Sequence, residues 1–171
     1  VILVCANYAD LPEILKNKNL GKADGLLLDL GLSSDQLEES GRGFSFKKNE
    51  PLDMRYNTTI QNSKLNSKNL TAEKVVNQCS EKELADLIYK YGEERFSRRI
   101  AKTIIKEREK KPIKTTFDLV EIIKKSVPKN YEKGRIHPAT RTFQSLRIYV
   151  NNELSNLSKL LTNLEKILNF K

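Results

Sequence analysis

Two short apolar runs, residues 1–5 and 25–30, constrain the fold more than any other feature of the sequence. Each run is continuous rather than alternating, and a helix-like stretch over residues 10–16 lies between them. Continuous runs joined through a helix are typical of strands in a parallel sheet that is covered on both faces. We therefore predict an α/β fold that begins with two parallel strands and one helix.

After residue 71 the apolar residues recur with a helical period. Thr71 is expected to cap one helix, and Ser80 with Glu83 three residues later forms a capping-box pattern ahead of another. A later helix is expected to be capped by Thr116. Residues 71–128 are therefore predicted to form an all-helical unit.

A second helical pattern runs over residues 139–168, where apolar residues recur every three or four positions. Such a stripe is typical of one long helix that packs on a core. Between the strand-like and helical regions, residues 38–69 are polar but carry scattered apolar residues. Long loops of this kind are more often functional than idle.

The composition excludes several classes of protein. With 38% hydrophobic and 31% charged residues, 7 Gly and 5 Pro, the chain is expected to be folded and helix-rich. Its longest apolar run is only a few residues, against roughly 20 for a membrane-spanning helix, so no membrane protein is predicted. Cys5 and Cys79 lie far apart and His137 is the single histidine, so neither a disulfide scaffold nor a metal site is expected.

The net charge of +9 is unevenly distributed. Residues 1–60 hold 7 Lys+Arg against 9 Asp+Glu, a net of −2, whereas residues 61–171 hold 24 against 13, a net of +11. A basic helical region beside a neutral one suggests a polyanionic partner such as RNA. The alternative is a solvated, Lys-rich surface that reflects a Lys/Asn-biased composition.

Residues 29–36, which directly follow the second predicted strand, are a candidate ligand site. Ligands of open parallel sheets bind at the carboxyl ends of the strands. There Asp29 can accept hydrogen bonds, Gln36 can both donate and accept, and Gly31 allows close approach of the backbone. Tyr8, just past the first strand, could lie against a flat adenine-like ring. The alternatives are an ordinary turn and a packing tyrosine.

The loop between Arg42 and Arg55 is a candidate nucleotide clamp. Its arginines can grip phosphates, and Phe44 and Phe46 can stack on splayed bases. The competing interpretation is a loop that folds back and places both phenylalanines in the core.

A third candidate site lies where the predicted helix 139–168 begins. Arg141 and Gln144 are near its amino end, which attracts anions. His137 precedes the helix and is a possible general base, although a structural or hydrogen-bonding role is the more common one for a lone histidine.

Four segments in this order resemble one family, the RsmH (MraW) methyltransferases: ADGLLLDLGLSSDQLEESGRGFSF, PLDMRYN, YGEERFSRRIAKTI and HPATRTFQSLRIYVNNEL. Members of that family use S-adenosylmethionine to methylate the N4 amine of a cytidine in 16S ribosomal RNA of the small subunit. The resemblance implies a cytoplasmic enzyme with a Rossmann-like methyltransferase core and an inserted helical domain. It implies no membrane and no metal, and indicates no oligomeric state.

The resemblance also implies roles for individual residues. Tyr8, where the family usually has Phe after Asn, is expected to contact S-adenosylmethionine together with Asp29 and Gln36. Ser33 and Ser34 are our hypothesis for groups near the target cytosine. That base must be unpaired or flipped to be reached, and the loop from Arg42 to Arg55 is the expected clamp.

On this basis we expect three parts: residues 1–43 as methyltransferase core, 44–136 as an inserted substrate-binding domain, and 137–171 as a return helix of the core. The family's glycine-rich cofactor loop is expected before residue 1, and its closing strands after residue 171. We therefore expect the chain to represent the middle of such an enzyme, either a fragment or a degenerate copy.

Two other functions remain open at this point. The first is a non-catalytic, basic helical module that binds RNA in a salt-dependent way without affinity for the cofactor. The second is a dinucleotide-binding oxidoreductase, which would need a G-x-G-x-x-G turn that this sequence lacks.

Overall fold

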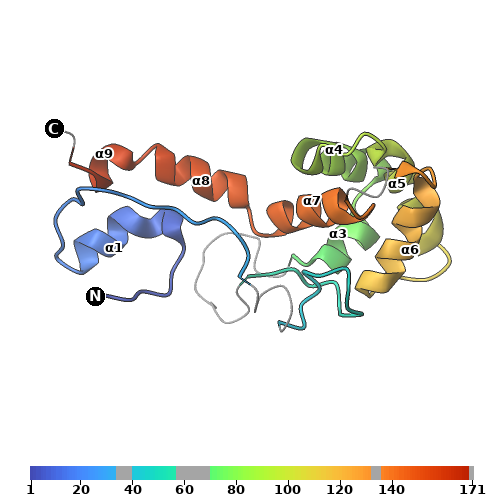
Figure 1. Cartoon of the computed structure of the whole chain (residues 1–171), viewed down its shortest axis with the longest axis horizontal. Coiled ribbons are helices and arrows are strands. Elements are labelled where there is room, and N and C mark those ends of the chain that lie inside the picture. The colour runs from blue at the N-terminus through green and yellow to red at the C-terminus, as the bar shows by residue number, and fades with distance from the viewer. Residues whose placement is uncertain (34–39, 57–69, 132–135, 170–171) are drawn as a thin grey trace. The chain divides into compact units, whose positions relative to one another are not determined.

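The computed structural model describes residues 1–33, 40–56, 70–131 and 136–169. Gln36 and Ser34 therefore lie outside the described residues. The described part is helical, in the order labelled in Figure 1. A short 3-10 turn, η1, spans Tyr8–Asp10, and the helices are α1 (Leu11–Asn17), α3 (Ala72–Gln78), α4 (Glu81–Gly92), α5 (Ser97–Arg108), α6 (Thr116–Ser126), α7 (Thr140–Val150), α8 (Glu153–Leu161) and α9 (Leu164–Ile167).

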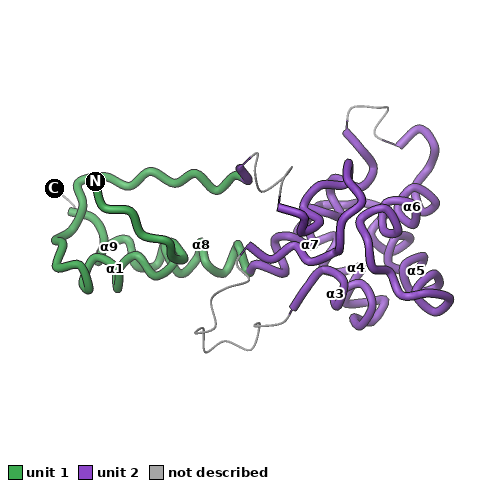
Figure 2. The backbone as a smooth tube through the Cα atoms, turned by 90° about the horizontal axis from the view of Figure 1, so that it is seen from below, with its two compact units in different colours: residues 1–31, 152–171 green, residues 32–151 purple. Residues whose placement is uncertain are grey.

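The chain divides into two compact units, residues 1–31 with 152–171 and residues 32–151 (Figure 2). We call the second one the helical unit. It includes α7, because this helix packs against α4. Residues 137–151 thus group with the helices, whereas the sequence predicts residues 137–171 together as a return helix of the methyltransferase core.

The helical unit is built around one apolar core. Helix α4 packs against both α5 and α7, and α5 also packs against α6. The loop before α3 adds Phe44, Leu52 and Met54 to this core. Its large, fully buried side chains on the helices are Leu84, Ile88, Ile100, Ile104, Leu119, Ile123 and Leu146.

Side-chain caps fix where these helices begin. The hydroxyl of Thr71 accepts from the amide of Lys74, and Ser80 forms the predicted capping box with Glu83. The prediction for Thr116 is wrong by one residue. Thr115 is the N-cap of α6, whereas Thr116 is buried and donates its hydroxyl to the carbonyl of Lys48.

The expected long helix over residues 139–168 is divided into α7, α8 and α9. The first break falls at Asn152, whose φ of 51° lies in the left-handed region. A helix cannot continue through that conformation, which asparagine adopts more readily than most residues. The apolar stripe therefore does not belong to one continuous helix.

The unit of residues 1–31 and 152–171 is held by polar contacts between distant segments. Tyr8 donates its hydroxyl to the carbonyl of Glu153 at 3.1 Å, and Lys159 contacts Asp10 at 2.7 Å. Among the residues that the structure describes in this unit, one parallel bridge is formed, between Ala23 and Leu168.

The predicted parallel strands over residues 1–5 and 25–30 are not found in the described part of the chain. These segments have neither regular secondary structure nor a pairing partner there, and Leu3 and Leu27 are 91% and 95% exposed. A strand requires a neighbour that accepts and donates its backbone hydrogen bonds, and no described segment supplies one. Among the described helices, none is long and apolar enough to cross a membrane.

Candidate functional site

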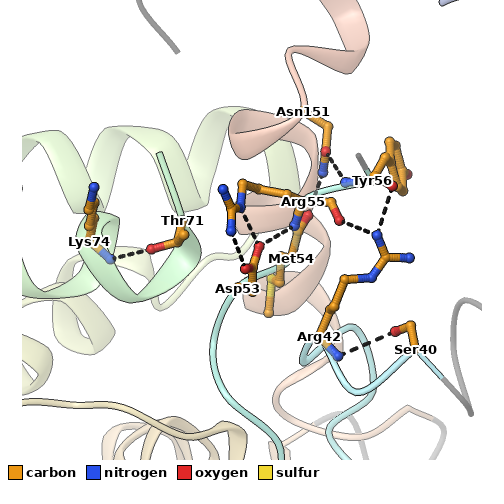
Figure 3. Close-up of polar contacts among 9 residues, drawn as sticks. All are labelled: Ser40, Arg42, Asp53, Met54, Arg55, Tyr56, Thr71, Lys74 and Asn151. Atoms are coloured by element: carbon orange, nitrogen blue, oxygen red, sulfur yellow. Dashed lines mark hydrogen bonds and ion pairs between the residues drawn. The ribbon is translucent and has the colours of Figure 1, made fainter. Parts of the chain in front are cut away.

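The loop of residues 40–56 is folded on itself by backbone contacts, as Figure 3 shows in part. Arg42 donates from one guanidinium nitrogen, Nη1, to the carbonyls of Arg55 at 2.9 Å and Tyr56 at 2.7 Å. Its own carbonyl accepts from the amide of Met54 at 2.7 Å. Arg42 therefore joins the two ends of the loop, which keeps the predicted clamp residues Arg42 and Arg55 close together.

Arg55 is paired with Asp53 through two side-chain contacts. Nε lies 2.7 Å from Oδ1 and Nη2 lies 2.6 Å from Oδ2, which is the forked geometry that favours Arg–carboxylate pairs. Burial opposes ionisation of Asp53, but the hydrogen bonds and charge of Arg55 outweigh it and lower the pKa of the carboxyl. Both side chains remain about a quarter exposed, with 27% for Arg55 and 22% for Asp53.

Asn151, at the end of α7, fastens this loop to the helices (Figure 3). Its Nδ2 donates to the carbonyls of Met54 at 2.7 Å and Arg147 at 2.9 Å, and its Oδ1 accepts from the amide of Tyr56 at 2.8 Å. Sequence reasoning missed this residue, since it lies some 95 positions away from the loop it holds. The two consecutive asparagines at 151–152 were the sequence signal available for a helix end at this point.

The ring of Phe44 lies in the core of the helical unit, stacked on Tyr56 with centroids 5.5 Å apart. The guanidinium of Arg42 lies over the same ring at 5.4 Å. Phe44 is only 6% exposed, so contact with a base would require the loop to open.

Phe46 and His137 come together, although 91 positions separate them in the sequence. Their rings stack at 4.5 Å, and Phe143 packs edge-on against Phe46 at 5.6 Å. Burial, with the nearby charge of Lys124, lowers the pKa of His137, which favours a neutral ring at pH 7. Its Nδ1 accepts from the amide of Ala139, so the proton of the neutral ring sits on Nε2. This geometry favours a hydrogen-bond donor over the general base considered from sequence.

Arg141 and Gln144 line a hollow of about 320 Å³ at the start of α7. Gly92, at the end of α4, forms part of its wall. A Cβ on Gly92 would lie 2.4 Å from the carbonyl of Arg141, so only glycine lets these two helices approach so closely. Arg141 also donates to the carbonyl of Glu93 at 3.2 Å.

The structure describes three of the predicted cofactor and cytosine residues, Tyr8, Asp29 and Ser33. Gln36 and Ser34, which were predicted to act with them, lie outside the described residues. Asp29 is exposed, and its Oδ1 accepts from the amide of Gly31 at 3.0 Å, while its Oδ2 has no hydrogen-bond partner in the described residues. Ser33 is exposed. The hydroxyl of Tyr8 binds Glu153, and burial, with the charge of Glu153, raises its pKa. Tyr8 and Asp29 form no hydrogen bond with each other.

The structure thus brings the clamp residues Arg42 and Arg55 together through polar contacts, and the guanidinium of Arg42 lies over the ring of Phe44. It brings Phe46 to His137, and it places Arg141 with Gln144 at one hollow. Within the described ranges, no three His, Cys, Asp or Glu side chains gather as metal ligands.

The Asp53–Arg55 pair predicts a pH dependence of stability. Since folding lowers the pKa of Asp53, the pair contributes fully above the unfolded carboxyl pKa of about 4 and is lost as pH falls through the folded pKa. The difference in free energy of unfolding between wild type and Asp53→Asn should therefore be larger at pH 7 than at pH 3. Denaturant unfolding at both values measures it.

Asp86→Asn is the matched control, because Asp86 is exposed and has no ion pair among the described residues. Its effect should differ little between pH 7 and pH 3. An equal cost of Asp53→Asn at both pH values would contradict the assigned pair.

Comparison with known proteins identifies the family. The model of the MraW methylase family matches residues 1–171. The ribosomal RNA small subunit methyltransferase H of Thermosipho melanesiensis is 50% identical over 169 residues, which cover 98% of this chain and 54% of that protein. The enzymes of the same name from Deinococcus radiodurans and Synechocystis are 52% and 51% identical, over 88% and 90% of the chain and 45% of each relative.

The chain spans about half the length of the curated relatives it matches. The match to the family model extends over all 171 residues and includes the four segments that carried the resemblance. The resemblance stated from sequence is therefore confirmed, and the chain belongs to the MraW methylase family.

Proposed function

We propose that this chain is part of an S-adenosylmethionine-dependent methyltransferase that acts on the N4 amine of a cytidine in 16S ribosomal RNA of the small ribosomal subunit, in the cytoplasm. The observation that carries the proposal is the family match over the whole chain, with relatives named for methylation of small-subunit ribosomal RNA. The same match argues against the dinucleotide-binding oxidoreductase considered from sequence.

Asp29 is the residue that best fits the cofactor. It lies near the end of the apolar segment of residues 25–30, is exposed, and has a carboxylate oxygen without a partner in the described residues. Such an oxygen accepts hydrogen bonds from the hydroxyl or amino groups of a nucleoside. Gln36 and Tyr8 are proposed to complete the contact. S-adenosylmethionine would supply the activated methyl group, and this chain's residues would position it.

The substrate is proposed to bind the helical unit. Methyl transfer to a ring amine requires the lone pair to point at the methyl carbon, so the protein contributes chiefly position. Arg55, Arg141 and Gln144 offer exposed or half-exposed polar groups for RNA, and the Phe46–His137 stack offers a flat apolar surface. Arg42 and Phe44 are proposed to hold the loop in shape.

Ser33 and Ser34 remain our hypothesis for groups near the target amine. A single-turnover assay of Ser34→Ala tests this role. A slower methyl transfer at unchanged cofactor affinity is expected, and an unchanged rate would remove this serine from the mechanism.

Transfer of a labelled methyl group tests the proposed function. The protein, as expressed from its own gene, is incubated with labelled S-adenosylmethionine and small ribosomal subunits. We expect label in the RNA, and about 10- to 100-fold weaker cofactor binding in Asp29→Asn, since a hydrogen bond to a charged group contributes about 1.5–3 kcal/mol. Asp86→Asn is the control with unchanged binding.

A second candidate is a non-catalytic RNA-binding module. It is favoured by the core that residues 32–151 form by themselves and by the basic surplus of that part of the chain. This candidate predicts salt-dependent RNA binding with neither cofactor binding nor label transfer.

A further inference from the structure

Helix α5 carries a row of cations along one side. Arg98, Arg99, Lys102 and Lys106 are all exposed, and Arg95 is exposed in the turn just before the helix. At 100° per residue, the four positions on the helix fall within one arc of about 100°. We call these five residues the α5 basic face.

The opposite side of α5 is fixed in the core of the helical unit. Ser97, Ile100, Ala101 and Ile104 are buried there, where α5 packs against α4 and α6. Because the apolar side is already covered, rotation of the helix cannot hide the cations. The α5 basic face therefore stays directed at solvent, over about 12 Å from Arg98 to Lys106 at 1.5 Å per residue.

Two of the arginines rest on aromatic rings. The guanidinium of Arg95 lies 5.1 Å from the ring centre of Phe96 and 5.2 Å from that of Tyr131, and Arg99 lies 5.6 Å from Phe96. Stacking of this kind restricts the guanidinium and leaves its in-plane N–H donors open to a ligand. These arginines are thus positioned in advance of binding.

The rings themselves are anchored from below by Glu94, which is 0% exposed. Its Oε2 accepts from the hydroxyl of Tyr131 at 2.5 Å, and its Oε1 accepts from the amide of Phe96 at 2.8 Å. Phe96 and Tyr131 also pack edge to face at 5.2 Å. The buried carboxylate thereby serves as a fixed support for the exposed arginines.

Carboxylates do not neutralise the α5 basic face. In the part of the chain that the structure describes, none of its five cations forms an ion pair, whereas Lys110, Lys111 and Lys124 each contact a carboxylate within 4.0 Å. The nearest acidic residues in sequence are Glu94 and Glu107. Glu94 is buried beneath the rings, and the carboxylate of Glu107 pairs with Lys110 at 2.7 Å. The positive charge of the α5 basic face therefore remains available for a polyanion.

We infer that the α5 basic face binds the sugar–phosphate backbone of RNA. This inference rests on the proposed function. It adds a surface that contains none of the candidate site residues. Rigid arginine forks match phosphate oxygens, and a row of cations matches a chain of phosphates. A membrane-surface helix would present an apolar side to lipid, but the apolar side of α5 is buried.

Binding to small-subunit ribosomal RNA, measured without cofactor at several salt concentrations, tests this surface. In one variant, Arg95, Arg98 and Arg99 are all changed to Gln; in the matched control, the exposed Lys82, Lys114 and Lys125 are changed to Gln. Each lost phosphate contact lowers the slope of log K against log salt by about 0.7–0.9, so the arginine variant should lose about 2–3 in slope. At 0.15 M salt it should bind on the order of 50-fold more weakly, with little change in the control.

A second variant, Lys102→Gln with Lys106→Gln, keeps the inference testable if loss of the stacked arginines disturbs folding, since neither lysine contacts a ring. The slope of log K against log salt should fall by about 1.5 for this variant.

Equal RNA binding by either variant and the control would overturn the inference, as would absence of RNA binding by the unmodified protein. Loss of binding to anionic vesicles or an acidic protein, with RNA binding intact, would also overturn it. Cofactor titration of the same samples tests the proposed function separately.

Discussion

Replacing Gly43 with alanine is expected to destabilise the helical unit by about 2–5 kcal/mol. Backbone strain in the left-handed region contributes about 1–2 kcal/mol of this cost, and overpacking contributes about 1–3 kcal/mol. Gly43 has a φ of 74°, which a residue with a Cβ rarely adopts. That Cβ would also lie 2.3 Å from the carbonyl oxygen of Pro51 and 3.2 Å from Cγ2 of Thr116. The backbone at Pro51 would have to move away, which would disturb the loop of residues 40–56.

Gly41→Ala is a control two residues away. Gly41 has a similar φ of 63°, but a Cβ there would meet nothing within 4 Å. It should therefore show the backbone strain alone, about 1–2 kcal/mol. Urea unfolding of both variants separates strain from the steric clash. If Gly43→Ala costs no more than Gly41→Ala, the close approach of Pro51 to Gly43 is wrong.

Replacing Asn151 with alanine is expected to cost about 2–6 kcal/mol, since it leaves two backbone groups unsatisfied and each costs about 1–3 kcal/mol. The carbonyl of Arg147 also accepts from the amide of residue 151 and so keeps a partner. Both unsatisfied groups belong to the loop, the carbonyl of Met54 and the amide of Tyr56. Met54 is fully buried with a φ of 59°, a conformation that surrounding contacts must maintain. Loss of Asn151 should thus loosen the loop that carries Arg42 and Arg55.

Denaturant unfolding measures this cost, and Gln78→Ala is the control. Gln78 is exposed at the end of α3, so its replacement should stay within about 0.5 kcal/mol. Asn151→Asp is the sharper variant, because it keeps the acceptor for Tyr56 but sets a carboxylate against the carbonyls of Met54 and Arg147. An Asn151→Ala variant as stable as Gln78→Ala would contradict the assigned role of Asn151.

Local signals predicted the starts of the helices well. Hydroxyl caps act within three residues, so Thr71 and the Ser80–Glu83 pair could be located from sequence. For α6, two adjacent threonines competed, and the spacing of Asp118 three residues after Thr115 was the signal that decides between them. The break at Asn152 was missed because an apolar stripe reports which side is buried, not the φ of one residue.

Long-range contacts set the limit of prediction for the candidate site. A phenylalanine between glycine and serine can lie in the core or stack on a ligand. Phe44 lies in the core, but the sequence does not distinguish this from an exposed ring. The contacts from Asn151 to the loop and from Phe46 to His137 join residues more than 90 positions apart. No periodicity or spacing encodes such pairs.

The two predicted strands show a related limit. Apolar runs over residues 1–5 and 25–30 indicate a tendency to be buried, but a strand exists only where a neighbour pairs with it. In the described residues the one parallel bridge joins Ala23 to Leu168 instead. The apolar pattern thus predicted two strands at segments that have no strand partner in the described residues.

Analysis of the nucleosides of the methylated RNA tests the central claim most directly. Small ribosomal subunits that lack the modification are incubated with the protein, as expressed from its own gene, and with labelled S-adenosylmethionine; the RNA is then digested and its nucleosides separated. The account predicts that the label is found in N4-methylcytidine. Label in any other nucleoside, or none in the RNA, would contradict it.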